Sequence, residues 1–84
     1  MTKEIINKMI DNSSWIDIKN NIIYKFTNRK NLLINGKSNL QYTLDSLGNK
    51  IVLQLGTNLY MVKYVNDFIL DLCNDIENIR ITPV

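Results

Sequence analysis

The sequence contains no histidine and only one cysteine, Cys73. Without histidine, the chain lacks the most common general base of enzymes and the most common ligand of transition metals. A serine nucleophile activated by histidine is therefore excluded. One cysteine forms neither an intrachain disulfide nor a cysteine-based zinc site, and we interpret Cys73 as a small, half-buried residue at a strand end. These absences predict a protein that is not an enzyme and holds no cofactor or metal.

Long apolar runs are also missing from the sequence. The N-terminal segment carries Glu4 and Asp11, and its apolar residues never run beyond Met9–Ile10, so it does not resemble a secretory signal. No stretch approaches the roughly 20 apolar residues of a membrane helix. The lone thiol fits a reducing compartment, so we expect a cytoplasmic protein that does not enter a membrane. Its length leaves no room for a second domain, which predicts a single domain over residues 1–84.

The first residues have the pattern of a short amphipathic helix. Thr2 is a suitable N-cap, and the apolar residues that follow share one face of a helix. The polar run at residues 11–14 favours a turn, because its side chains compete for backbone hydrogen bonds. The sequence predicts a helix over residues 2–12 that packs on the rest of the protein through Ile6, Met9 and Ile10.

From residue 15 to residue 82, short segments alternate between apolar and polar residues and are separated by turn signals, of which Asn35–Gly36 is the clearest. The predicted strands cover residues 15–19, 22–27, 32–35, 39–45, 51–55, 59–65, 68–72 and 79–81. Short connections make consecutive strands antiparallel neighbours. The predicted fold class is all-β with one short N-terminal helix, in which an antiparallel meander of about eight short strands forms a small barrel or barrel-like roll.

The interior of such a barrel is small. The alternation predicts that large side chains point inward and fill it: Tyr24, Phe26, Tyr42, Leu53, Phe68 and Leu70. A ligand pocket needs about 300 Å³ or more, and a filled barrel leaves little of that volume. We therefore expect the outer surface to be the working part of the molecule.

The order of these features resembles the small bacterial lipocalin-like domains of the calycin group. Trp15 begins the first strand after a short helix, Arg80 lies late in the chain, and residues 42–53 and 59–62 look like the middle hairpins. The resemblance covers about residues 2–82. It implies a barrel closed at one end by the helix, with Arg80 packed against Trp15. It also implies a cup for an apolar ligand or a protein-contact surface rather than an active site.

One acidic group and one lysine are the charged residues closest to a site of chemistry. The acidic group lacks the glycine and the ligand spacing of a calcium loop, which favours a solvated face: Asp67, Asp71, Asp75 and Glu77. Lys63 is flanked by apolar residues, but covalent catalysis requires a buried lysine, and we do not assign it that role.

Basic residues gather in the first half of the chain. Residues 1–42 carry a net charge of +4 and residues 43–84 a net charge of −2. The excess lies on one predicted strand and two turns: Lys25, Arg29, Lys30 and Lys37. A single-stranded nucleic acid is one conceivable partner for these cations. Tyr24 and Phe26 are in phase with the core, however, and a net charge of +2 is low. We interpret the four cations as a solvated basic rim and consider nucleic-acid binding unlikely.

Residues 59–65 are apolar on both faces, which is unusual for a half-exposed strand. Either the N-terminal helix covers the second face, or a partner does. We predict a partner-binding surface through Tyr60, Val62 and Tyr64, because tyrosine is favoured at interfaces. The functional prediction is a non-enzymatic binding module that contacts a protein partner or a second copy of itself. The alternatives are a lipocalin-like carrier of a small apolar ligand and, further, a module that binds single-stranded nucleic acid.

Overall fold

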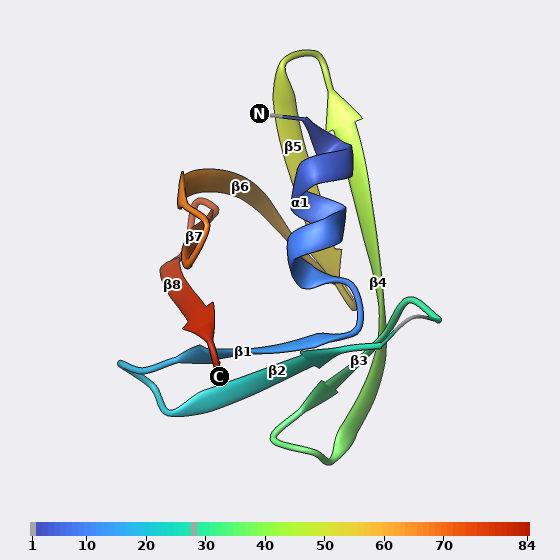
Figure 1. The fold of residues 1–84 in the computed structure, drawn as a ribbon, viewed down its shortest axis with the longest axis vertical. Coiled ribbons are helices and arrows are strands. Elements are labelled where there is room, and N and C mark those ends of the chain that lie inside the picture. The colour runs from blue at the N-terminus through green and yellow to red at the C-terminus, as the bar shows by residue number, and fades with distance from the viewer. Residues whose placement is uncertain (1, 28) are drawn as a thin grey trace.

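The computed structural model describes residues 2–27 and 29–84, apart from the side chains of Ser38 and Asn39. Within these residues one helix precedes eight strands, which pair in sequence order into a closed antiparallel barrel (Figure 1). The elements are α1 (Lys3–Ile10), β1 (Ser13–Asp17), β2 (Ile22–Phe26), β3 (Asn31–Ile34), β4 (Ser38–Leu47), β5 (Lys50–Leu55), β6 (Asn58–Asn66), β7 (Ile69–Cys73) and β8 (Asn78–Pro83). The predicted fold class is confirmed.

The long strand β4 joins the two halves of the barrel. Its first residues, 38–41, pair with β3, and its remaining residues, 42–47, pair with β5. The β4–β5 hairpin consequently extends beyond the neighbouring strands, and α1 lies alongside it (Figure 1). The helix thereby covers the part of this hairpin that the other strands leave open.

The helix is held by its cap and by two isoleucines. The Thr2 hydroxyl accepts a hydrogen bond from the backbone N–H of Ile5 at 3.4 Å. Ile6 and Ile10 are buried, and Met9 is partly buried against the core, as the sequence predicts. The helix ends at Ile10, slightly earlier than the predicted boundary.

The end of the helix is tied to the start of the barrel by one serine. The Ser13 hydroxyl donates to the carbonyl oxygen of Ile10 at 2.6 Å, and the indole Nε1 of Trp15 donates to the Ser13 oxygen at 3.0 Å. The indole itself is 2% exposed. Trp15 is therefore a core residue whose one polar atom is satisfied.

The turn between β3 and β4 has the geometry that its sequence predicts. Asn35 and Gly36 both have positive φ angles, 52° and 73°. The backbone N–H of Lys37 donates to the carbonyl oxygen of Ile34 at 3.0 Å, which closes a tight two-residue hairpin. The dipeptide thus fixes the register between these two strands.

Buried side chains from every strand fill the interior. Phe26 and Tyr42 meet edge to face, with ring centroids 5.0 Å apart. Of the predicted core residues, only Phe68 is misplaced, since it is 70% exposed. The β6–β7 pairing shifts register between Tyr64 and Asn66, and Phe68 lies in the turn, where its N–H donates to the Asn66 side chain. The alternation of β7 does not continue backward into this turn, so the predicted inward orientation of Phe68 is wrong.

We expect Trp15→Ala to lower the free energy of unfolding by about 3–5 kcal/mol, because a large buried aromatic side chain leaves a cavity when deleted. Phe68→Ala is the matched control. It removes an exposed ring and should change stability by no more than about 0.5 kcal/mol. Urea unfolding followed by circular dichroism measures both values, and equal losses for the two variants would contradict the core position of Trp15.

Candidate functional site

The three residues predicted to bind a partner face the interior. Tyr60 is 4% exposed, and Val62 and Tyr64 are partly buried against the core. In the register of β6 they stand opposite buried residues of β5 and β7: Leu53, Leu72 and Leu70. The prediction that they form an exposed surface is therefore wrong. Both faces of this strand are apolar, so the sequence does not indicate which set of alternate side chains points inward.

Both tyrosines of this set reach polar partners. The Tyr60 hydroxyl donates to Glu77 at 2.8 Å, and the Tyr64 hydroxyl donates to Asp67 at 2.6 Å. Burial, followed by the hydrogen bond to Glu77, raises the pKa of Tyr60 to about 12. A tyrosine ring can point inward when its hydroxyl group donates to an acceptor at the edge of the barrel. Tyrosine therefore occurs on the buried face of this strand.

The outer face of β6 presents the alternate residues. Leu59 is 55% exposed and Met61 is 46% exposed. Met61 stands opposite Val52 of β5 on one side and Cys73 of β7 on the other. With Leu47 at the tip of the β4–β5 hairpin, these residues line a shallow depression of about 530 Å³. We call this set the β6 surface: Leu47, Val52, Leu59, Met61 and Cys73.

The predicted basic rim does not form one continuous patch. Lys25 lies on β2, Arg29 and Lys30 precede β3, and Lys37 follows it, so the two turns are at opposite ends of a strand of 4 residues. Lys30 is also engaged in structure. Its ammonium donates to the Asn7 side chain of α1 at 2.8 Å and lies 5.4 Å from the centre of the Tyr42 ring. The four side chains are therefore spread out, and one of them connects the helix to the barrel.

We expect no binding of single- or double-stranded oligonucleotides at about 50 mM salt, because the basic side chains are not arranged along one groove. The aromatic rings of Tyr24 and Phe26 are buried and do not offer stacking platforms. An electrophoretic mobility shift assay measures this. A shift that weakens with salt and disappears in the double variant Arg29→Glu with Lys30→Glu would contradict the expectation.

The acidic residues near the C-terminus are separated by the fold. Asp67 and Glu77 accept hydrogen bonds from different tyrosines, and Asp75 is exposed in the turn after β7. Among the described residues, no three histidine, cysteine, aspartate or glutamate side chains are grouped to hold a metal ion. Asp71 differs from the expected solvated face because it is only 8% exposed. Its charge is balanced by a neighbour for which the resemblance implied a different contact.

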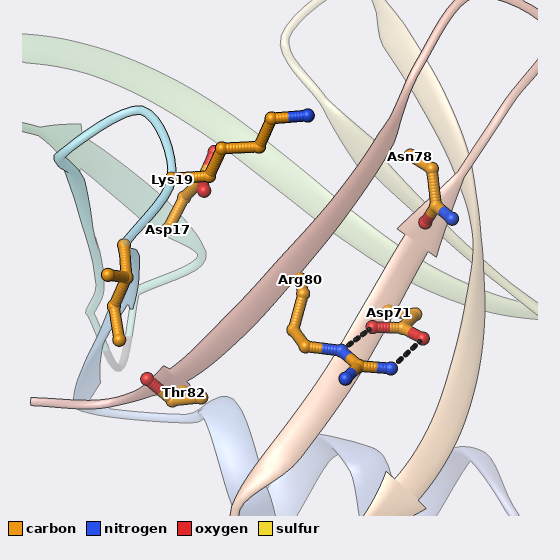
Figure 2. A pocket seen from close by; sticks show the side chains of 7 residues that line it. Asp17, Lys19, Asp71, Asn78, Arg80 and Thr82 are labelled. Atoms are coloured by element: carbon orange, nitrogen blue, oxygen red, sulfur yellow. Dashed lines mark hydrogen bonds and ion pairs between the residues drawn. The ribbon is translucent and has the colours of Figure 1, made fainter.

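That neighbour is Arg80, which lies beside Asp71 on the outer face of the barrel (Figure 2). The guanidinium donates to the two carboxylate oxygens at 2.8 and 3.0 Å. These hydrogen bonds lower the pKa of Asp71, while its burial acts in the opposite direction. Arg80 therefore points away from the interior that contains Trp15, and the packing of Arg80 on Trp15 implied by the resemblance is not found.

The pair borders a pocket of about 320 Å³ between β8 and the turn after β1 (Figure 2). We call it the seam pocket, because it lies where β1 and β8 close the barrel. Asp17, Ile18 and Lys19 line one side, and Asn78, Arg80 and Thr82 line the other. Asp17 is 2% exposed, and the backbone N–H and side-chain amide of Asn20 donate to its carboxylate at 3.3 and 2.8 Å. Sequence analysis missed this site, because only the β7–β8 register shows that Asp71 and Arg80 stand opposite each other.

Comparison with known proteins found no matching family model, curated protein or solved structure. The described part of the chain contains no helix long and apolar enough to cross a membrane. The closed eight-stranded meander is compatible with a lipocalin-like barrel. The β6 surface and the seam pocket are therefore the candidate functional sites of this protein.

Asp71→Asn should destabilise the protein at pH 7 by about 1 kcal/mol, a charged hydrogen-bond value reduced because Arg80 is exposed to solvent. The pKa of Asp71 is lower in the folded protein than its ordinary value of 3.8. Its stabilising contribution is thus complete above that value and is lost as the pH falls through the lowered folded value. The difference between wild type and variant in urea unfolding should shrink correspondingly below pH 3.8.

Asp75→Asn provides the matched control, since this carboxylate is exposed. It should leave stability within about 0.5 kcal/mol of the wild type at pH 7. A difference between wild type and Asp71→Asn that stays constant from pH 7 to acid would contradict the role of the ionised carboxylate.

Proposed function

We propose that this protein is a non-enzymatic binding module that acts by contact through the β6 surface, and that its protein partner is a second copy of the chain. The observation that carries the proposal is the exposure of Leu59 and Met61 on the outer face of the barrel, continuous with Val52 and Cys73. Apolar residues grouped on an exposed sheet face are typical of protein interfaces. The proposed contact surface is still the outer surface of β6, as predicted from the sequence. Its contact residues differ from the predicted ones.

The packed interior supports contact by the outer surface over transport of an apolar ligand. Side chains that would line a ligand cup, including Phe26, Tyr42 and Leu53, are at most 1% exposed and touch the other core residues. Membership of the lipocalin-like group, a bacterial source and a cytoplasmic location remain part of the proposal. The free thiol of Cys73 supports the last of these.

The charges around the β6 surface favour a second copy as the partner. Lys50 belongs to β5 and Asp75 to the turn after β7, so a positive and a negative side chain flank β6 on opposite sides. When two copies meet face to face about a two-fold axis that bisects the line between Lys50 and Asp75 at right angles, Lys50 of each copy stands near Asp75 of the other. The same patch is thus complementary to itself, which a two-fold dimer requires.

We expect the wild type to associate reversibly into dimers in sedimentation equilibrium and light scattering. Met61→Asp should raise the dissociation constant about tenfold or more, because it places a charge at the centre of the apolar contact. Phe68→Asp is the matched control, since it introduces the same charge at an exposed apolar residue outside the β6 surface.

Circular dichroism of both variants checks that the fold is retained. A wild type that stays monomeric at every concentration would overturn the proposal. So would equal weakening by Met61→Asp and Phe68→Asp. Co-purification of a lipid-like molecule with a monomer would instead support the carrier alternative.

A further inference from the structure

Strand β8 changes its pairing partner along its length. On its β7 side it pairs over residues 78–81, whereas on its β1 side it pairs only through Thr82 and Pro83, opposite Ile16 and Trp15. Among the described residues, no strand pairs with 78–81 on the β1 side. The seam pocket lies along this unpaired edge.

Two hydrogen bonds reveal which backbone groups face the pocket. The N–H of Val84 donates to the carbonyl oxygen of Ser14 in β1, and the N–H of Asn74 donates to the carbonyl oxygen of Glu77 at the turn after β7, each at 3.0 Å. Backbone groups of alternate residues point to opposite neighbours in an antiparallel sheet. Even-numbered residues of β8 therefore turn their N–H and C=O groups toward β1, and odd-numbered residues turn theirs toward β7.

It follows that the backbone N–H and C=O groups of Asn78 and Arg80 point into the seam pocket. These donors and acceptors are spaced as one edge of a β-ladder. Backbone groups of this kind are the template on which an extended peptide is added to a sheet.

The opposite wall of the pocket limits what fits there. The turn after β1, with Lys19, stands across the pocket from Arg80 (Figure 2), and Ile18 of the same turn also lines the pocket. A second barrel approaching the β8 edge would meet this turn, whereas one extended chain lies between the two walls. The pocket volume of about 320 Å³ accommodates a few residues of such a chain.

The exposed charge at the pocket is positive. Lys19 is exposed, and the Arg80 side chain is 60% exposed. The carboxylates of Asp17 and Asp71 are buried and already accept hydrogen bonds from Asn20 and Arg80. A bound peptide therefore meets two exposed cations, whereas each carboxylate oxygen of the two anions already accepts a hydrogen bond.

We propose that the seam pocket binds an extended peptide segment of a partner protein, which adds a strand to β8 and places an acidic side chain beside Arg80 and Lys19. The main-chain hydrogen bonds to Asn78 and Arg80 supply binding that is independent of peptide sequence, and the two cations supply the preference for acid. This site does not involve the β6 surface, so it holds or fails independently of the proposed dimer.

The test measures backbone amide exchange by NMR, with and without an acetylated and amidated octapeptide that alternates valine and glutamate. In the free protein, the amides of Asn78 and Arg80 should exchange faster than those of Ile79 and Ile81, which face β7. Saturating acidic peptide should slow the exchange of Asn78 and Arg80 by about tenfold or more, as expected when an exposed edge gains a ladder partner. An octapeptide alternating valine and lysine should bind more weakly.

Lys19→Glu tests the charge preference, and Lys37→Glu is its matched control, because it reverses an exposed lysine in the distant β3–β4 turn. Lys19→Glu should weaken binding of the acidic peptide about threefold or more, the scale of one exposed charge contact. Lys37→Glu should leave it unchanged.

Three results would overturn the proposal. The first is unchanged exchange of the Asn78 and Arg80 amides in saturating peptide. The second is equal binding of the acidic and basic peptides, which would remove the acidic preference. The third is slowing of these amides with protein concentration in the absence of peptide, which would make a second copy the occupant of the edge.

Discussion

The closure of the barrel between β1 and β8 is the constraint on which the other features of this structure depend. All the other strand pairings join neighbours in the sequence, so each needs only a short turn. The β1–β8 pairing joins the two ends of the described chain through two residue pairs, and Trp15 belongs to one of them. The indole is buried behind this junction and bonded to Ser13, which in turn holds the end of α1. The interior, the helix position and the seam pocket all follow from how these two strands meet.

The sequence was most informative where one face of a strand is apolar and the other polar. In β4 and β5, buried Tyr42, Leu44 and Leu53 alternate with more exposed residues, and their inward orientation was predicted correctly, although β4 continues to Leu47, two residues beyond its predicted end. The Asn35–Gly36 turn was equally predictable, because few residue pairs adopt two successive positive φ angles without strain. In these segments local chemistry and global fold impose the same conformation.

The predictions are wrong where the local sequence is compatible with two conformations or orientations. Tyr60 and Met61 are both large and largely apolar, so the orientation of β6 is decided by its buried neighbours on β5 and β7 rather than by its own sequence. The alternation predicted for β7 included Phe68, which lies in the preceding turn. The contact of Asp71 with Arg80 depends on hairpin register, which the alternation of either strand alone does not determine. Each error therefore concerns a property shared by several strands.

The nearly sequential pairing of the strands also bears on how the chain reaches this structure. Each hairpin brings together residues that are close in sequence, so it can form with little loss of chain entropy. Pairing Ile16 with Thr82 would demand a long loop if it formed first, but only a short gap remains once the intervening hairpins have assembled. Folding by successive addition of hairpins, with the meeting of β1 and β8 as the final step, is the route of lowest entropic cost. The same junction is held by two ladder pairs, so we expect it to open in thermal fluctuations more readily than the longer hairpin ladders.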